Sequence, residues 1–163
     1  AFTAAQAGLS SADGLLSASI SSWESTGQPA EETAALFKTR GGLRYQEGRL
    51  PAAREDLSKA LSLMQAPGSK PDAAEVQRTY QLRARVNGAL GNRREQVDDL
   101  SAAIARLDDL DVIEATNPFV FAERAKARMA VGEYAGAAED SETAEALFKD
   151  TGDKIRRTLA AAD

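Results

Sequence analysis

The densest group of side chains that could do chemistry is a run of carboxylates near the middle of the chain. Its members are Asp98, Asp99, Asp108, Asp109, Asp111 and Glu114. Carboxylates bind hard divalent cations, but such a site needs them at turn spacing, with a glycine that lets the loop close around the ion. No Asp-x-Asp-x-Asp-Gly pattern occurs here, and most of the run falls in a segment with helical periodicity. We therefore interpret the run as a solvated helix face and predict no metal site.

Glycine pairs are the second candidate, because glycine-rich loops can bind phosphates. Gly41 and Gly42 are adjacent, and Gly88 and Gly91 lie close together. A phosphate loop needs a strand before its glycines and a helix that opens after them, usually with a lysine. These glycines fall inside helical segments or at their ends, so we interpret them as packing and turn positions. No cofactor is predicted.

The residue types that most enzymes use are absent. The 163 residues include no His and no Cys, which removes the commonest general base, thiolate chemistry and the usual transition-metal ligands. The sequence contains no recognisable nucleophile–base pair or carboxylate dyad, so we expect no catalytic residues and no enzyme activity. The net charge of −5 argues against a general nucleic-acid binder, which normally carries a basic excess.

Composition indicates which elements would position any site. Hydrophobic residues make up 43% and charged residues 28%, as in ordinary soluble globular domains. Ala, Leu, Glu, Arg and Gln abound, whereas β-branched Val and Ile are scarce, so the chain is predicted to be all-α. No apolar run is long enough to cross a membrane. Apolar spacing predicts helices at 3–25, 30–47, 51–65, 72–90, 93–114, 118–131, 135–149 and 153–162.

One sequence pattern recurs three times along the chain. Each copy begins with an aromatic residue, an arginine three positions later and a small residue next to that arginine. The three copies are Phe37-x-x-Arg40-Gly41, Tyr80-x-x-Arg83-Ala84 and Phe121-x-x-Arg124-Ala125. A turn glycine (Gly48, Gly91 or Gly132) follows each copy, and then a second helix with small residues at matching places. Small residues let paired helices approach closely, so we expect Ala60 and Ala103 to be buried where helices cross.

This pattern resembles the tetratricopeptide repeat (TPR) family, in its longer-helix variety. The resemblance implies one domain over residues 1–163, a right-handed α-solenoid of about three helix pairs with capping helices at both ends. Arg44, Asn87 and Arg128 depart from the family pattern, which usually has a large apolar residue there. The expected parts are an N-terminal packing helix in 1–29, repeats at 30–67, 72–114 and 118–151, and a C-terminal cap at 152–163.

In the tetratricopeptide family, the first helix of each pair lines a concave groove that binds partner segments. Carried over by register, the resemblance implies groove residues on all three first helices. These are Lys38, Tyr45, Gln46, Arg78, Gln81, Arg85, Phe119, Ala122, Lys126 and Met129. Basic and aromatic side chains together suit a protein or peptide with acidic and apolar side chains. Binding of a chaperone's C-terminal tail is not expected, because Gly42, Leu82 and Glu123 replace three residues of the family's tail clamp.

We therefore expect a protein–protein interaction module, an adaptor or assembly factor whose groove binds a segment of a larger complex. The alternative is a permanent structural subunit, docked by its outer face or its N-terminal helix; a regulatory domain of a longer enzyme is a third interpretation. An accessible groove would favour the first, whereas a groove filled by residues 3–25 would favour the second. The start at Ala1 without Met favours a processed organellar or exported protein.

Overall fold

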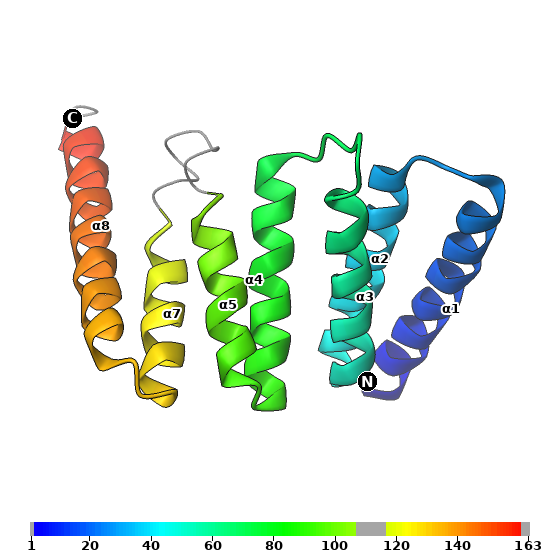
Figure 1. Cartoon of the computed structure of the whole chain (residues 1–163), viewed down its shortest axis with the longest axis horizontal. Helices are drawn as coiled ribbons and strands as arrows, with labels where there is room; N and C mark the ends of the chain where they lie inside the picture. Colours follow the sequence, from blue (N-terminus) through cyan, green and yellow to red (C-terminus); the bar gives the residue numbers. More distant parts are fainter. Residues whose placement is uncertain (1, 107–116, 161–163) are drawn as a thin grey trace.

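The computed structural model describes residues 2–106 and 117–160, and Figure 1 shows these as a single row of helices. The helices are α1 (Phe2–Thr26), α2 (Ala30–Gln46), α3 (Leu50–Met64), α4 (Ala73–Leu90), α5 (Arg93–Ile104), α7 (Pro118–Ala130) and α8 (Tyr134–Ala160). No strand occurs in the described ranges. The predicted all-α class is confirmed.

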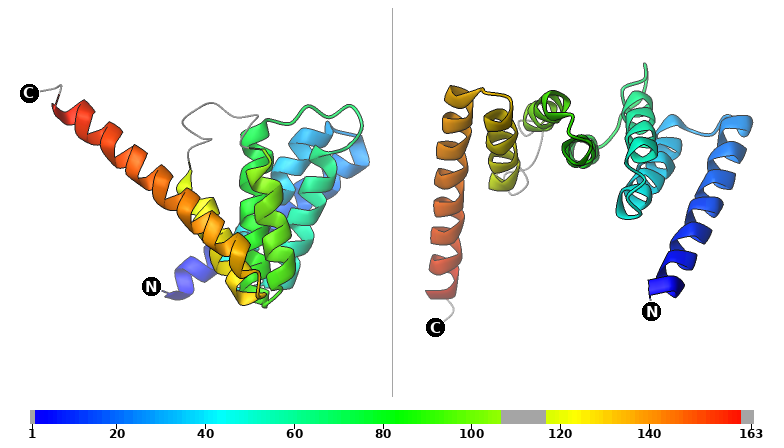
Figure 2. Two further views of the ribbon diagram at one scale, coloured as in Figure 1. Left: turned by 60° about the vertical axis from the view of Figure 1, so that its left-hand side comes forward. Right: turned by 90° about the horizontal axis from the view of Figure 1, so that it is seen from below.

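Each helix packs mainly against its neighbours in sequence. The pairs α2–α3, α4–α5 and α7–α8 form the closest associations, and α3–α4 and α5–α7 join one pair to the next. Such a stack buries the apolar stripe of every pair against the adjacent pairs, as in an α-solenoid. The long helices α1 and α8 stand at the two ends of the row and extend toward the same side of it (Figure 2).

Glycines turn the chain between the two helices of each pair. Gly48, Gly91 and Gly132 have φ values of +75°, +84° and +83°, a left-handed conformation that costs little only without a Cβ. The next residue closes the end of the first helix in each case, as where the Asn92 N–H donates to the Asn87 carbonyl at 2.9 Å. The predicted turn positions are confirmed.

Small residues allow the helices of each pair to pack closely. Ala60 and Ala103 are completely buried, so their predicted burial is confirmed. A Cβ placed on Gly41 would lie 2.9 Å from Leu57 Cγ on the second helix, which is closer than carbon atoms can approach without displacement. These positions therefore set the separation between first and second helices.

The C-terminal end differs from the prediction. The break expected between the helices predicted at 135–149 and 153–162 is absent, because α8 continues without interruption to Ala160. The predicted separate helix at 153–162 is thus the continuation of α8. Glycine in a helix interior costs only about 1 kcal/mol relative to alanine, so Gly152 does not end the helix. α5 ends at Ile104, earlier than the helix predicted at 93–114. The part of that segment from residue 107 onward, which includes four of the six clustered carboxylates, lies outside the described residues.

The described helices also bear on the membrane prediction. Within residues 2–106 and 117–160, no helix is both long enough and apolar enough to cross a bilayer. This agrees with the absence of a long apolar run in the sequence.

Candidate functional site

The predicted groove residues of α7 form one exposed stripe, which we call the α7 stripe. It consists of Phe119, Ala122, Lys126 and Met129, whose spacings of three, four and three residues place them on one helix face. Phe119 and Met129 are 62% and 60% exposed. Asn117 fixes the start of the helix, because its Oδ1 accepts the Phe119 N–H at 3.1 Å. The first turn of α7 therefore holds Phe119 in place.

The predicted basic residues of α2 and α4 lie on neighbouring first helices but are paired with acids. Lys38 on α2 forms an ion pair with Glu75 on α4, which also binds Arg78 at 3.0 Å. Arg85 on α4 binds Glu123 on α7 at 3.2 Å. These pairs link α2 to α4 and α4 to α7, so the first helices share a face, as the register implies. The acids Glu75 and Glu123 reduce the positive charge that the basic residues alone would give this face.

Three other predicted groove residues contribute less to an open surface. Tyr45 is half-buried and packs against the cluster of Ala53, Leu57 and Val86. Gln81 is also half-buried, whereas Gln46 is exposed at the end of α2. Tyr45 therefore stabilises the first pair, and the most accessible large groove residues are those of the α7 stripe.

Every helix pair contains the same buried ion pair, which sequence reasoning missed. In the first pair, Arg40 Nε and Nη2 donate to Asp56 at 2.9 and 2.7 Å. The same two-point contact joins Arg83 to Asp99 and Arg124 to Asp140, again sixteen residues apart. The three aspartates are only 2–4% exposed. A constant spacing from arginine to aspartate is the signal that could have revealed these pairs in the sequence.

Each of these arginines also contacts the helix that precedes its own pair. Nη1 donates to a serine hydroxyl there: Ser17 on α1, Ser58 on α3 and Ser101 on α5, at 3.0, 3.1 and 3.2 Å. The guanidinium groups also lie 5.3–6.0 Å from the aromatic rings of Phe37, Tyr80 and Phe121. Each arginine thus links three helices, and Ser17 places α1 where a second helix would stand.

α8, the second helix of the last pair, differs at the equivalent positions. Glu142 stands two residues after Asp140, where Ser58 follows Asp56, and Glu145 replaces the buried Leu61. Both glutamates are exposed. The outer face of α8 is therefore polar, as terminal elements of solenoids require.

A second donor supports the buried aspartate in each pair and explains the departures from the family pattern. Arg44 Nη1 and Arg128 Nη1 each approach their aspartate to 3.0 Å. In the middle pair Asn87 replaces this arginine and donates from Nδ2 to Asp99 at 2.9 Å. Arg44, Asn87 and Arg128 occupy positions where the tetratricopeptide pattern has a large apolar residue. Each of them donates to a buried carboxylate, which an apolar residue could not do.

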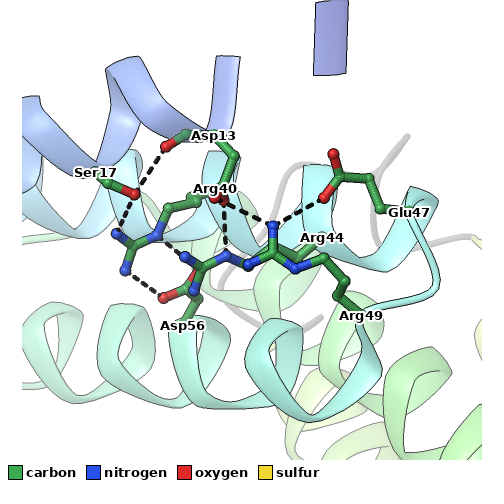
Figure 3. Close-up of polar contacts among 7 residues, drawn as sticks. All are labelled: Asp13, Ser17, Arg40, Arg44, Glu47, Arg49 and Asp56. Atoms are coloured by element: carbon green, nitrogen blue, oxygen red, sulfur yellow. Dashed lines mark hydrogen bonds and ion pairs between the residues drawn. The ribbon is translucent and has the colours of Figure 1, made fainter. Parts of the chain in front are cut away.

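Ion pairs between α1 and the first repeat shift the acidity of Asp13. Figure 3 shows Asp13 receiving hydrogen bonds from Arg44 Nε at 2.8 Å and Arg49 Nη1 at 3.1 Å. The hydrogen bond from Arg44 has the largest effect and lowers the pKa of Asp13; burial, the next largest, raises it, and the hydrogen bond from Arg49 lowers it again, so that the net shift is downward. The pKa of Glu75 is likewise lowered, first by the hydrogen bond from Lys38. Neither Arg44 nor Arg49, the residues that Asp13 on α1 binds, is a predicted groove residue.

Comparison with known proteins adds no assignment to this geometry. No protein-family model matches the chain, and no curated protein matches it. The functional interpretation therefore depends on the surfaces described above.

Proposed function

We propose that the chain is a protein-binding module of tetratricopeptide type whose main contact surface is the α7 stripe. The observation that carries this proposal is the exposure of Phe119 and Met129, 62% and 60%, on the face where the register places a groove. Large apolar side chains gathered on a surface are typical of binding sites, since their burial by a partner supplies most of the binding energy.

A second aromatic residue extends this apolar surface onto α8. The Phe148 ring meets the Phe119 ring edge to face, with centroids 5.0 Å apart and an interplanar angle of 88°. Phe148 is itself 43% exposed. Because the two rings already support each other, a partner that covers them loses little side-chain entropy on binding.

The chemistry of the α7 stripe indicates what kind of segment it would accept. Lys126 lies between Ala122 and Met129 and has no ion pair in the part of the chain that the structure describes. A partner segment with apolar side chains on either side of one carboxylate would match this order. Ala122 leaves room for the partner's backbone. The ion pairs on α2 and α4 make those helices weaker attractants for acidic side chains.

The proposal is tested by site-specific crosslinking followed by binding measurements. A photoreactive phenylalanine analogue replaces Ala122 in one variant and the exposed Ser22 on α1 in a control, and both are illuminated in extract from the source cells. Crosslinked peptides specific to position 122 are then synthesised and titrated against the purified chain. We expect F119S/M129S to weaken binding at least tenfold and L15S, at a 70% exposed site on α1, to leave it unchanged. Equal crosslinking from both positions would overturn the proposal.

One observation favours the alternative of a permanent structural subunit. Large apolar residues are also exposed away from the α7 stripe, with Leu15 on α1 at 70% and Tyr134 on α8 at 71%. A subunit held within a complex would bury such sites at both ends of the row. Loss of complex assembly in L15S, with wild-type behaviour of F119S/M129S, would support this function instead.

A further inference from the structure

A hollow of about 870 Å³ lies between the second helices α3 and α5, over α4. We call it the middle-pair pocket. Ser58, Arg83, Asn87 and Asp99 line its deeper part. Because α3 and α5 form its sides, it is separate from the α7 stripe on the first helices.

The pocket coincides with the one place where the repeated ion-pair arrangement changes. The first and third pairs use a second arginine, Arg44 or Arg128, against the buried aspartate. The middle pair has Asn87 there, so Asp99 is bonded by one guanidinium and one neutral amide. The middle pair therefore lacks one of the two cations that the other pairs hold.

Asn87 also has an unused hydrogen-bonding group. Its residue is only 3% exposed, and it lines the pocket. Nδ2 donates to Asp99, but Oδ1 is buried and accepts no hydrogen bond. A buried acceptor without a donor destabilises a fold by about 1–3 kcal/mol. Asn87 is therefore an incomplete replacement for the arginine that the first and third pairs hold at this position.

The upper part of the pocket carries an excess of negative charge. Glu55, Glu95 and Asp98 are exposed carboxylates that line it, and none has an ion pair within the described residues. Arg54 is the one unpaired cation among its lining residues. Arg54 stands four residues before Ser58, the same position that Asp13 holds relative to Ser17 on α1. The helix that precedes the middle pair therefore has an arginine at the position of the aspartate that binds Arg44 in the first pair. The surplus of carboxylates favours a positively charged ligand.

We propose that the middle-pair pocket binds the guanidinium group of an arginine side chain on a partner protein. The guanidinium would supply the second cation of the middle pair, lying in the pocket beside Asn87 and donating to the exposed carboxylates of Glu95 and Asp98. Its planar fork of N–H donors suits several acceptors at once, which a lysine ammonium would match less well. Binding here is independent of the α7 stripe and requires the opposite charge from the partner.

The probe for this site is N-acetyl-arginine amide, with N-acetyl-citrulline amide as its neutral isostere. Both are titrated into the ¹⁵N-labelled chain and followed by two-dimensional NMR. We expect saturable shifts of the Asn87 side-chain amide and the Asp98 backbone amide with the arginine compound. The dissociation constant should be on the order of millimolar, as for a single side chain. Equal shifts with citrulline would overturn the proposal, because the site would not be selecting a cation.

Variants distinguish the pocket from general electrostatic attraction. N87R should place the missing arginine and abolish binding, while E95Q/D98N should weaken it at least fivefold. E142Q/E145Q removes two exposed carboxylates on α8 outside the pocket and should leave binding unchanged. If N87R does not fold, E95Q/D98N decides the matter, and undiminished binding there would refute the proposal. F119S/M129S should bind the arginine probe normally, so this inference and the proposed function can fail separately.

Discussion

Arg124 and Asp140 lie sixteen residues apart and join α7 to α8 through a two-point ion pair, with Nη2 2.6 Å from Oδ1. Their side chains are 14% and 4% exposed. The same spacing and geometry recur in the other two pairs, so one interaction repeats along the whole stack. An arginine suits this position because its fork can bind the carboxylate and a neighbouring serine together.

Removing one partner of such a pair should destabilise the fold strongly. R124A leaves Asp140 buried with an incomplete set of donors, and we expect a loss of about 3–5 kcal/mol in the free energy of unfolding. The matched control is R94A, since the Arg94–Glu133 pair spans 3.2 Å with Arg94 70% exposed; its cost should stay within about 0.5 kcal/mol. Urea denaturation measures both. Equal small effects would show that the buried pairs do not stabilise the stack.

Added bulk at the helix crossings should also destabilise the fold. Ala60 and Ala103 are fully buried, so leucine at either position has no space and should cost about 1–3 kcal/mol through overpacking. A89L, at an exposed position of α4, adds the same atoms without crowding. Thermal unfolding of the three variants tests this, and unchanged midpoints for A60L and A103L would contradict the packing described.

Much of this fold is predictable from the sequence because the repeats are in register. The turn glycines Gly48, Gly91 and Gly132 require a left-handed conformation, and small residues mark the crossings, so helix pairs follow from local chemistry. Helix ends without such a requirement are less predictable. Gly152 resembles a turn residue, but α8 passes through it, because nothing in the surrounding sequence forces the chain to leave the helix.

The candidate site is less predictable, because charge compensation depends on the neighbouring helices. The sequence places Lys38 and Arg85 on the groove face, but Glu75 and Glu123 reach them from the next helix. Asp99 stands in an acidic run that we interpreted as solvated, yet it is buried against Arg83. In both cases the partner lies far away in sequence, so only the packing of the pairs reveals it.

α1 should behave as an integral cap of the stack. Ile20 is 3% exposed and packs against Phe37 and Ala60, so I20A should cost about 2–5 kcal/mol. L15A, at a 70% exposed site of the same helix, should change stability by less than about 0.5 kcal/mol. Chemical denaturation compares them, and hydrogen exchange should show faster opening of α2 in I20A. Similar stability of the two variants would mean that α1 is not part of the cooperative unit.

Acid should weaken the contact between α1 and the first repeat. Arg44, and then Arg49, hold the pKa of Asp13 below its ordinary value of 3.8. At pH values between the pKa of Asp13 in the folded chain and this ordinary value, Asp13 binds a proton more readily in the unfolded chain than in the folded one. The contribution of Asp13 is therefore complete above about pH 4 and is lost as pH falls through the folded pKa.

The variant D13N isolates this contribution. Denaturant unfolding at pH 7, 5, 4 and 3 should show a smaller loss of stability on acidification for D13N than for the wild type. E142Q, which removes an exposed carboxylate of α8, should follow the wild-type curve. Parallel curves for D13N and the wild type would show that the Asp13 contacts do not couple folding to pH.

The charge of the α7 stripe should determine how partner binding depends on salt. Lys126 has no ion pair among the described residues, whereas Arg85 is neutralised by Glu123 at 3.2 Å. For a peptide captured through position 122, K126E should therefore weaken binding more than R85E does. Salt should weaken wild-type binding, because charge attraction is screened over about 10 Å at 0.1 M ionic strength, and this weakening should disappear or reverse in K126E. Isothermal titration at two salt concentrations measures both effects. Equal affinity and salt dependence in the wild type and K126E, with the fold intact, would exclude the α7 stripe as the charged contact.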